Sequence, residues 1–230
     1  SCHEVSTNEP TMNIEVVPPA TRVGFMGPHG TFTEQALLGQ PDLAAADTRP
    51  FDSIPDVLNG LVTGEVDLGF VPIENAIEGA VNVTQDTLAF DLDLRIQREV
   101  ILDVQLNLLA LPGTQLKDIH TVVSFPVAVA QCRNFLREQL PEAEIQAATS
   151  TAEAARQVGG QRLEGVATIS NPLAAELYGL EAVAEAVEDH PGNQTRFLLL
   201  AREGVPAATG HDKTSVVVFQ RANEPGSLLA

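Results

Sequence analysis

The feature of this sequence that most restricts its fold is a junction that recurs five times. A short apolar run ends in polar side chains, and a helical pattern follows; the polar positions are Thr31, Glu74-Asn75, Ser124, Thr149-Ser150 and Ser170-Asn171. Alternating strands and helices are typical of α/β proteins, and such junctions lie along the carboxyl edge of a mainly parallel sheet. Each polar residue also has a local explanation as a helix cap. Together they predict a site for an oxygen-rich small molecule.

The charge balance limits what such a site can bind. The sequence has 31 acidic and 13 basic residues, a net charge of -18. This charge repels phosphate backbones, so we expect no nucleic acid as a partner. An anionic ligand would have to be held by local donors, and the five junctions supply hydroxyls, amides and helix N-termini.

The cysteines and histidines do not indicate a disulfide or a metal centre. Cys2 lies in the N-terminal tail, and Cys132 lies on the apolar stripe of a helical pattern, where we expect a core residue and not a nucleophile. The five histidines show no ligand spacing. No apolar run approaches the roughly 18 residues of a membrane span, and residues 1–20 lack the pattern of a secretion signal. We therefore expect a cytoplasmic protein without membrane contact.

The first junction follows a strand expected at residues 23–26. Residues 27–30 form a glycine turn, and the four residues from Thr31 to Glu34 form a capping box that starts a helix. This arrangement could seat an anion at the helix N-terminus. A plain tight turn explains it equally well, because the sequence is neither G-x-G-x-x-G nor a phosphate loop with its lysine.

Periodicity predicts the elements that follow. A helix is expected between a cap at Asp52 or Ser53 and a stop at Gly64. Further expected elements are a strand at 66–73, a helix at 84–90, a strand at 102–108, a strand at 121–123, a helix at 126–140, a strand at 145–148 and a strand at 166–169. Gln131 lies off the apolar stripe of its helix, and is either a surface residue or a donor in a cleft.

The segment at 193–200, Asn-Gln-Thr-Arg-Phe-Leu-Leu-Leu, places polar residues directly before an apolar run. The run predicts a buried strand at 197–201. Because a strand alternates its faces, Thr195 and Phe197 should share one face and Arg196 should lie on the other. These side chains could form a site at the start of the strand, or Thr195 could be an ordinary strand residue and Arg196 a solvated charge.

These motifs together resemble the prephenate dehydratase family of phenylalanine biosynthesis. The resemblance covers about Arg22 to Arg202, and the matching segments are 27–33, 72–75 with Gly79, 124–132, 150–152, 178–180 and 193–197. The Asn-x-Thr-Arg-Phe element at 193–197 is the most specific. The family often has Ser-His-Pro-Gln where this chain has Ser-Phe-Pro-Val at 124–127, so any role of that histidine or glutamine is absent here.

The resemblance implies an α/β protein with the two-lobed, periplasmic-binding-protein-like type II fold and a cleft between its lobes. The catalytic domain would span 22–203, with lobe one at about 22–100 and 193–203 and lobe two at about 101–192. Residues 1–21 would be a disordered extension and 204–213 a linker. Residues 214–230 look like the beginning of an incomplete ACT regulatory domain, with a strand at 214–220.

The resemblance also implies a carbon–oxygen lyase that converts prephenate to phenylpyruvate, carbon dioxide and water. Aromatisation of the ring drives the reaction, so no cofactor is expected. Thr195 would donate to the departing hydroxyl, and Glu74 is the alternative acid if burial raises its pKa. The expected substrate contacts are Thr31, Asn75, Ser124, Gln131, Thr149, Arg196 and Phe197. For Arg196, a structural ion pair is the alternative.

The resemblance further implies phenylalanine as an allosteric effector of the complete protein, and a homo-oligomer, either a dimer or a tetramer. Whether arogenate is also a substrate stays open. Two hypotheses from other classes stay open as well, because a fold does not fix a function. One is a solute-binding or effector-sensing module with the same two lobes, and the other is an amino-acid sensor built around the C-terminal segment.

Overall fold

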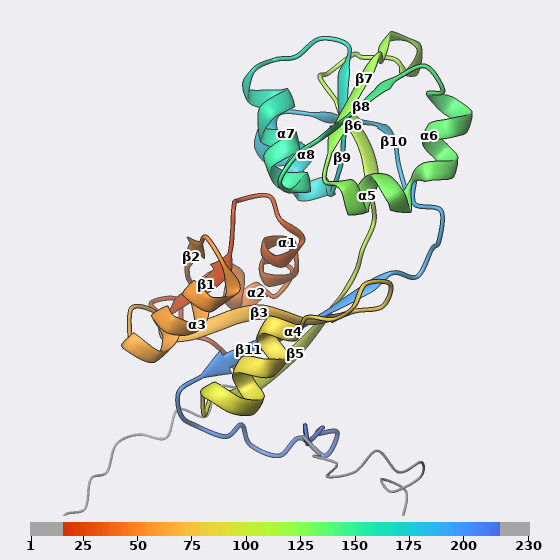
Figure 1. The fold of residues 1–230 in the computed structure, drawn as a ribbon. Coiled ribbons are helices and arrows are strands. Elements are labelled where there is room, and N and C mark those ends of the chain that lie inside the picture. Colours follow the sequence, from red (N-terminus) through yellow and green to blue (C-terminus); the bar gives the residue numbers. More distant parts are fainter. Residues whose placement is uncertain (1–15, 217–230) are drawn as a thin grey trace, which may run out of the picture.

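The computed structural model describes residues 16–216, which form two α/β lobes (Figure 1). Lobe one contains the strands β1 (Arg22–Met26), β2 (Asp47–Phe51), β3 (Leu68–Asn75), β4 (Gly79–Ala80), β5 (Arg95–Asp103) and β11 (Gln194–Ala201). Its helices are α1 (Phe32–Leu38), α2 (Pro41–Ala44), α3 (Ile54–Thr63), α4 (Asn82–Asp86) and the π-helical turn η1 (Thr87–Asp91).

Lobe two contains the middle of the chain. Its strands are β6 (Asn107–Ala110), β7 (Thr121–Ser124), β8 (Glu144–Ala147), β9 (Val166–Ser170) and β10 (Glu181–Ala184). Its helices are the 3₁₀ turn η2 (Leu116–Asp118), α5 (Pro126–Gln131), α6 (Arg133–Gln139), α7 (Thr151–Gly160) and α8 (Pro172–Tyr178).

Each lobe is built on one mixed sheet. The strand order is β2-β1-β3-β11-β5 in lobe one, with β4 paired to β3, and β10-β6-β9-β7-β8 in lobe two. The parallel pairs are β1 with β2 and β3, and β7 with β8 and β9; the pairs that include β11, β6 or β10 are antiparallel. The two-lobed, type II periplasmic-binding-protein-like fold expected from the sequence is confirmed, although the sheets are mixed and not mainly parallel.

Two extended segments connect the lobes and lie side by side. One is residues 104–106 between β5 and β6, and the other is the segment that leads from β10 into β11 (Figure 1). The N–H of Val104 donates to the carbonyl of Asn193 at 2.8 Å, which extends the β5–β11 pairing into the hinge. The single strand expected at 102–108 is therefore wrong. The alternation of apolar and polar residues continues through the connecting segment 104–106, which leads from β5 in one lobe to β6 in the other.

Local signals account for the helices that the sequence predicts well. Ser53 caps α3 by accepting from Asp56 N, and Gly64 ends that helix with φ at 79°. Ser150 caps α7 in the same way, and Asn171 caps α8 by accepting from Ala174 N. A hydroxyl or amide oxygen satisfies an N–H that the first turn of a helix leaves free, so these polar residues fix where each helix starts.

The helix expected at 126–140 is broken at Cys132, where α5 ends and α6 begins. The carbonyl of Gln131 accepts from Asp189 N at 2.7 Å, and the carboxylate of Asp189 accepts from Asn134 N at 3.0 and 3.1 Å. A loop near the C-terminal limit of lobe two in the sequence thus supplies partners for the end of α5 and the start of α6. The break leaves Gln131 at the end of α5.

The ends of the described chain differ from expectation in two respects. Val17, expected in a disordered extension, is 1% exposed in the core of lobe one, and its N–H donates to Asp42 at 3.0 Å. The rest of that extension, residues 1–15, lies outside the described residues. Of the strand expected at 214–220, residues 214–216 have no regular structure and the remainder also lies outside. No helix within 16–216 has the length and apolar character needed to cross a membrane.

Candidate active site

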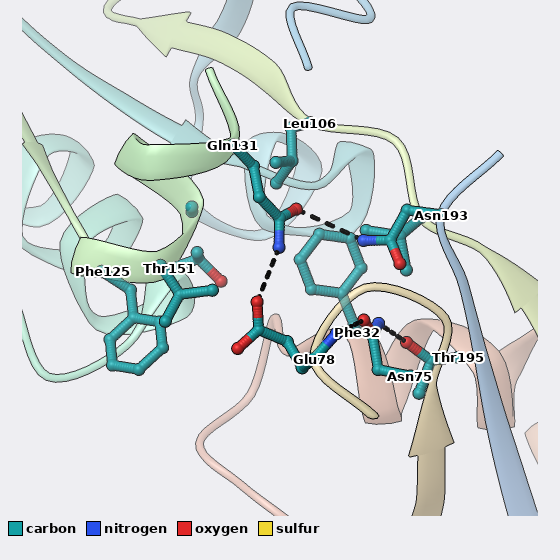
Figure 2. A pocket seen from close by; sticks show the side chains of 12 residues that line it. Phe32, Asn75, Glu78, Leu106, Phe125, Gln131, Thr151, Asn193 and Thr195 are labelled. Carbon is teal, nitrogen blue, oxygen red and sulfur yellow. Dashed lines mark hydrogen bonds between the residues drawn. The ribbon is translucent and has the colours of Figure 1, made fainter. Parts of the chain in front are cut away.

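A hollow of about 180 Å³ lies between the lobes, next to the hinge. Both lobes and both connecting segments contribute to its lining (Figure 2). The lining residues are Phe32, Asn75, Glu78, Val104, Leu106, Phe125, Val127, Ala128, Gln131, Thr151, Asn193 and Thr195. Neutral donors and acceptors predominate among its polar groups, and Glu78 is the one charged residue in this set.

Thr195 lies at the start of β11 and is 9% exposed. Asn75, at the end of β3, is its partner in the antiparallel register, and Asn75 Nδ2 donates to Thr195 Oγ1 at 2.7 Å (Figure 2). Because the hydroxyl oxygen accepts this bond, its own proton is available for another acceptor. The arrangement makes Thr195 a positioned hydrogen-bond donor in the hollow.

Gln131 reaches the hollow from lobe two. Its Oε1 accepts from Asn193 Nδ2 at 3.3 Å, and its Nε2 donates to Glu78 Oε1 at 3.3 Å (Figure 2). Asn193 is 4% exposed, and its Oδ1 is buried without a hydrogen-bond partner among the described residues. A buried polar atom without a partner is costly, so this oxygen is a natural acceptor for a bound hydroxyl or amide.

Apolar side chains complete the lining. Phe32 comes from α1 in lobe one and packs against the core of lobe two, while Phe125 comes before α5 and is 38% exposed. Thr151, the first residue of α7, adds a hydroxyl at a helix N-terminus. The capping pattern at 150–153 is a sequence signal for Thr151, but Phe32, Phe125 and Asn193 were not singled out as contacts.

The face of β11 opposite Thr195 carries an ion-pair network. Arg196 Nη1 donates to Glu74 at 2.6 Å and Nη2 donates to Glu99 at 2.6 Å, while Glu99 also accepts from Lys213 at 2.5 Å. Glu99 and Glu74 raise the pKa of the guanidinium. Arg196 is therefore held in a structural ion pair, the alternative that the sequence left open, and it does not line the hollow.

Glu74, the alternative acid, lies away from the hollow. Its side chain is 46% exposed, is paired with Arg196 and is not among the residues that line the hollow. It follows that Thr195 is the member of the expected catalytic pair that faces the hollow.

The first junction is occupied by the protein itself. Thr31 Oγ1 accepts from Glu34 N at 3.2 Å, so Thr31 is a helix cap and not part of the lining. The Glu34 carboxylate, on a residue that is 5% exposed, accepts from Gly30 N at 2.6 Å and contacts His29 Nδ1 at 2.7 Å. The anion seat expected there is filled by Glu34, and Thr31 lies away from the hollow in which it was expected to contact substrate.

Three further expected contacts lie away from the hollow. Ser124 is fully buried and donates to the carbonyl of Ile169 at 2.7 Å, which joins β7 to β9. Thr149 is exposed and does not line the hollow. Phe197 is 1% exposed and stacks on Phe70 in the core, with ring centroids 5.2 Å apart. Of the expected site, the structure brings together Thr195, Asn75 and Gln131.

Cys132 is buried, as expected for a core residue. Burial raises the pKa of its thiol to about 12, with a further contribution from Glu188 and Asp189. The thiolate that a nucleophile requires is therefore not formed at neutral pH. Among residues 16–216, no group of three histidine, cysteine or acidic side chains is arranged to hold a metal ion.

A second set of contacts joins the lobes on the side of α1 and α8. Tyr178 Oη donates to the carbonyl of His29 at 2.6 Å, and Asn171 Nδ2 donates to the carbonyl of Gly30 at 3.0 Å. A side chain at Gly30 would meet Tyr178 at 3.0 Å, and φ at this residue is 88°. The glycine turn thus brings the lobes close together beside the hollow.

Fold and site define a two-lobed α/β protein with a largely uncharged cleft of mixed polar and apolar lining at its hinge. Residues 23–205 match the sequence profile of the family described as prephenate dehydratase. The chain belongs to the prephenate dehydratase family.

Individual relatives and solved structures are similar over most of the chain. The chain is 43% identical over 222 residues to the prephenate dehydratase of Mycolicibacterium vanbaalenii, covering 90% of this chain and 70% of that protein. Among solved structures, it is similar to the prephenate dehydratase of Arthrobacter aurescens in complex with L-Phe, with a TM-score of 0.79 at 40% identity, covering 90% of this chain and 69% of that one. It is also similar to GqqA, described as a novel type of quorum quenching acylase, with a TM-score of 0.70 at 28% identity, covering 80% and 65%.

Proposed function

We propose that this protein catalyses the decarboxylating dehydration of prephenate to phenylpyruvate, and that Thr195 acts on the leaving hydroxyl. The family assignment supports the reaction. The observation that supports the role of Thr195 is the 2.7 Å hydrogen bond from Asn75 Nδ2 to its Oγ1, inside the cleft.

The proposed chemistry needs no oxidant or reductant. The bond from the ring to its carboxylate breaks and releases carbon dioxide, and the electron pair moves into the ring as the carbon–oxygen bond to the hydroxyl breaks. One proton from solvent completes the departing water. An alcohol is a weak acid, so Thr195 would act as a hydrogen-bond donor to the departing oxygen and not as the net source of that proton.

The lining of the cleft suits a reaction that removes a carboxylate. Among the lining residues there is no lysine, arginine or histidine to stabilise the ring carboxylate in the ground state. Binding energy is then available for the change that occurs only in the transition state. Gln131 and Thr151 would supply neutral donors for the substrate's carboxylates, Asn193 Oδ1 would accept from the ring hydroxyl, and Phe32 would pack on the ring.

The first test adds prephenate to the protein at neutral pH and follows phenylpyruvate by its ultraviolet absorbance in alkali, after subtraction of the spontaneous acid conversion. We expect turnover without added cofactor. Thr195→Ala should lower kcat by about 10²-fold or more, the usual contribution of a positioned donor. Thr195→Ser keeps the hydroxyl and should retain most activity. Activity of Thr195→Ala within a few-fold of the parent would remove Thr195 from the chemistry.

The same assay addresses the two non-enzymatic hypotheses. A solute-binding or sensing module should close on prephenate and leave it unchanged, so stoichiometric binding without product would favour it. The amino-acid sensor concerns residues that lie mainly outside the described part of the chain.

The remaining expectations are carried forward as part of this proposal. The catalytic domain would span 22–203, followed by a linker at 204–213 and the start of an ACT domain at 214–230. The complete protein would bind phenylalanine as an effector, form a homo-oligomer and act as a carbon–oxygen lyase in the cytoplasm. Lobe one contacts the first and last residues of that linker: Gln97 Nε2 donates to the carbonyl of Gly204 at 2.9 Å, and Lys213 Nζ donates to Glu99 at 2.5 Å.

A further inference from the structure

Glu78 is the one charged residue among those that line the cleft. It lies in the turn between β3 and β4 in lobe one, and its Oε1 accepts from Gln131 Nε2 in lobe two at 3.3 Å (Figure 2). The carboxylate thus spans the space between the lobes. It also lines a second hollow of about 280 Å³, together with Ile77, Val127, Ala130, Gln131 and His190.

The backbone around Glu78 directs its side chain across the cleft. Asn75 Oδ1 accepts from Ile77 N and Glu78 N, both at 2.9 Å, and Gly79 turns the chain back with φ at 84°. Asn75 also pairs with Gly79 in the β3–β4 register. The same asparagine donates to Thr195, so the turn that carries Glu78 is attached directly to the proposed donor.

The hydrogen bonds of Gln131 show what Glu78 competes with. Gln131 Oε1 is engaged by Asn193, so the Nε2 group is what this side chain offers to a ligand, and Glu78 is bound to it. A carboxylate is also the group that a substrate with two carboxylates would present to such a donor. No lysine, arginine or histidine lines the 180 Å³ hollow between the lobes. A second anion beside Glu78 in that hollow would therefore be repelled with little compensation.

We infer that Glu78 is a specificity-determining residue of the cleft: its carboxylate holds, on Gln131 Nε2, the position that a substrate carboxylate takes. Substrate binding displaces the Glu78 carboxylate toward the second hollow. The hydrogen bond between Glu78 and Gln131, which links the lobes, then breaks. The inference rests on the proposed function, because it takes the substrate to be dianionic prephenate. Glu78 acts on substrate affinity and takes no part in the bond-breaking step.

The Glu78→Gln variant isolates the charge, because its amide oxygen can still accept from Gln131 Nε2. We expect the KM for prephenate to fall by about two- to fivefold, the effect of one solvated like charge, with kcat within twofold of the parent. Added salt screens exposed charges, so it should lower the KM of the parent by a larger factor than that of the variant, which keeps the general repulsion of an acidic chain. Glu142→Gln, at an exposed position between α6 and β8, removes the same charge away from the cleft and should leave both parameters unchanged.

The outcomes separate this inference from the proposed function. A lower KM with reduced salt dependence in Glu78→Gln alone supports it. An unchanged KM, the same change in Glu142→Gln, or a collapse of kcat at constant KM overturns it, the last by placing Glu78 in the chemistry. If the parent binds prephenate by calorimetry without turnover, the proposed reaction fails, and tighter binding by Glu78→Gln would still support the inference. Absence of both turnover and binding overturns both.

Discussion

At the scale of single residues, the side-chain amide of Asn75 uses both of its ends. Its Nδ2 donates to Thr195 at 2.7 Å, and its Oδ1 accepts from two N–H groups of the turn that carries Glu78. The first bond determines which way the threonine hydroxyl can donate, and the second fixes the turn. We regard Asn75 as a positioning residue, where the sequence predicted a direct substrate contact.

The Asn75→Asp variant tests this role. The introduced carboxylate can still accept from the N–H groups of Ile77 and Glu78, but it would accept the proton of Thr195 and reverse their hydrogen bond. We expect kcat to fall by at least about tenfold, a substantial part of the contribution of the threonine donor, with little change in melting temperature. The added carboxylate is one more like charge beside a dianionic substrate, so KM should rise by no more than about two- to fivefold. A loss of kcat/KM that comes from KM alone, with kcat unchanged, would contradict the positioning role. Steady-state kinetics and a thermal melt measure both.

The sequence predicted part of this site because local chemistry and strand alternation are visible in it. Thr195 and Arg196 were expected on opposite faces, and the structure places one in the cleft and the other in an ion pair. Other expected contacts lie outside the cleft, because their hydrogen-bonding groups are taken by other residues of the protein. Ser124 is occupied by Ile169, and the helix N-terminus near Thr31 is occupied by Glu34. A capping residue and a ligand contact have the same sequence pattern.

At the scale of elements, strong local signals gave correct helices and longer apolar runs gave correct strands. The elements that were not anticipated are short or polar: α2 has four residues, and β10 consists of four residues at the edge of its sheet. The break at Cys132 could not be anticipated, because the loop that causes it contains Asp189, far along the chain. The hinge at 104–106 kept the alternation of a strand although it leaves one sheet for another.

The pair of glycines that ends α7 gives a prediction about element packing. A Cβ at Gly159 would lie 2.2 Å from the backbone carbonyl oxygen of Tyr178, whereas a Cβ at Gly160 would meet nothing within 4 Å. Gly159→Ala should therefore push α7 from α8 and lower the free energy of unfolding by about 1–3 kcal/mol. Gly160→Ala should be neutral or raise it by up to about 1 kcal/mol, because alanine favours helix. Chemical denaturation measures both, and equal effects would refute the close approach.

At the scale of the whole molecule, two groups of hydrogen bonds within residues 16–216 join the lobes besides the hinge strands, and the packing of Phe32 against lobe two adds to them. One crosses the cleft through Glu78 and Gln131, and the other joins Tyr178 and Asn171 to the glycine turn of lobe one. They lie on different elements, so each can be altered while the other stays. The closed arrangement is the one in which the hollow has walls from both lobes.

Tyr178→Phe removes one interlobe hydrogen bond without changing the ring. A hydrogen bond of this kind contributes about 0.5–1.5 kcal/mol, so we expect the KM for prephenate to rise by about two- to tenfold while kcat changes little. Glu176→Gln is the matched control, because it changes an exposed side chain of the same helix. The radius of gyration without ligand, from small-angle X-ray scattering, should increase for Tyr178→Phe. Unchanged KM and radius would show that this contact does not hold the lobes closed.

The contact made by Tyr178 has a spectroscopic consequence. The sequence contains one tyrosine and no tryptophan, so the near-ultraviolet absorption and intrinsic fluorescence of the protein come chiefly from the residue that joins the lobes. Burial, and next the charge of Glu34, raise the pKa of its phenol. Opening of the lobes would expose this group and bring its ionisation back toward the ordinary range of a solvated tyrosine. The unlabelled protein therefore carries its own optical reporter of lobe closure.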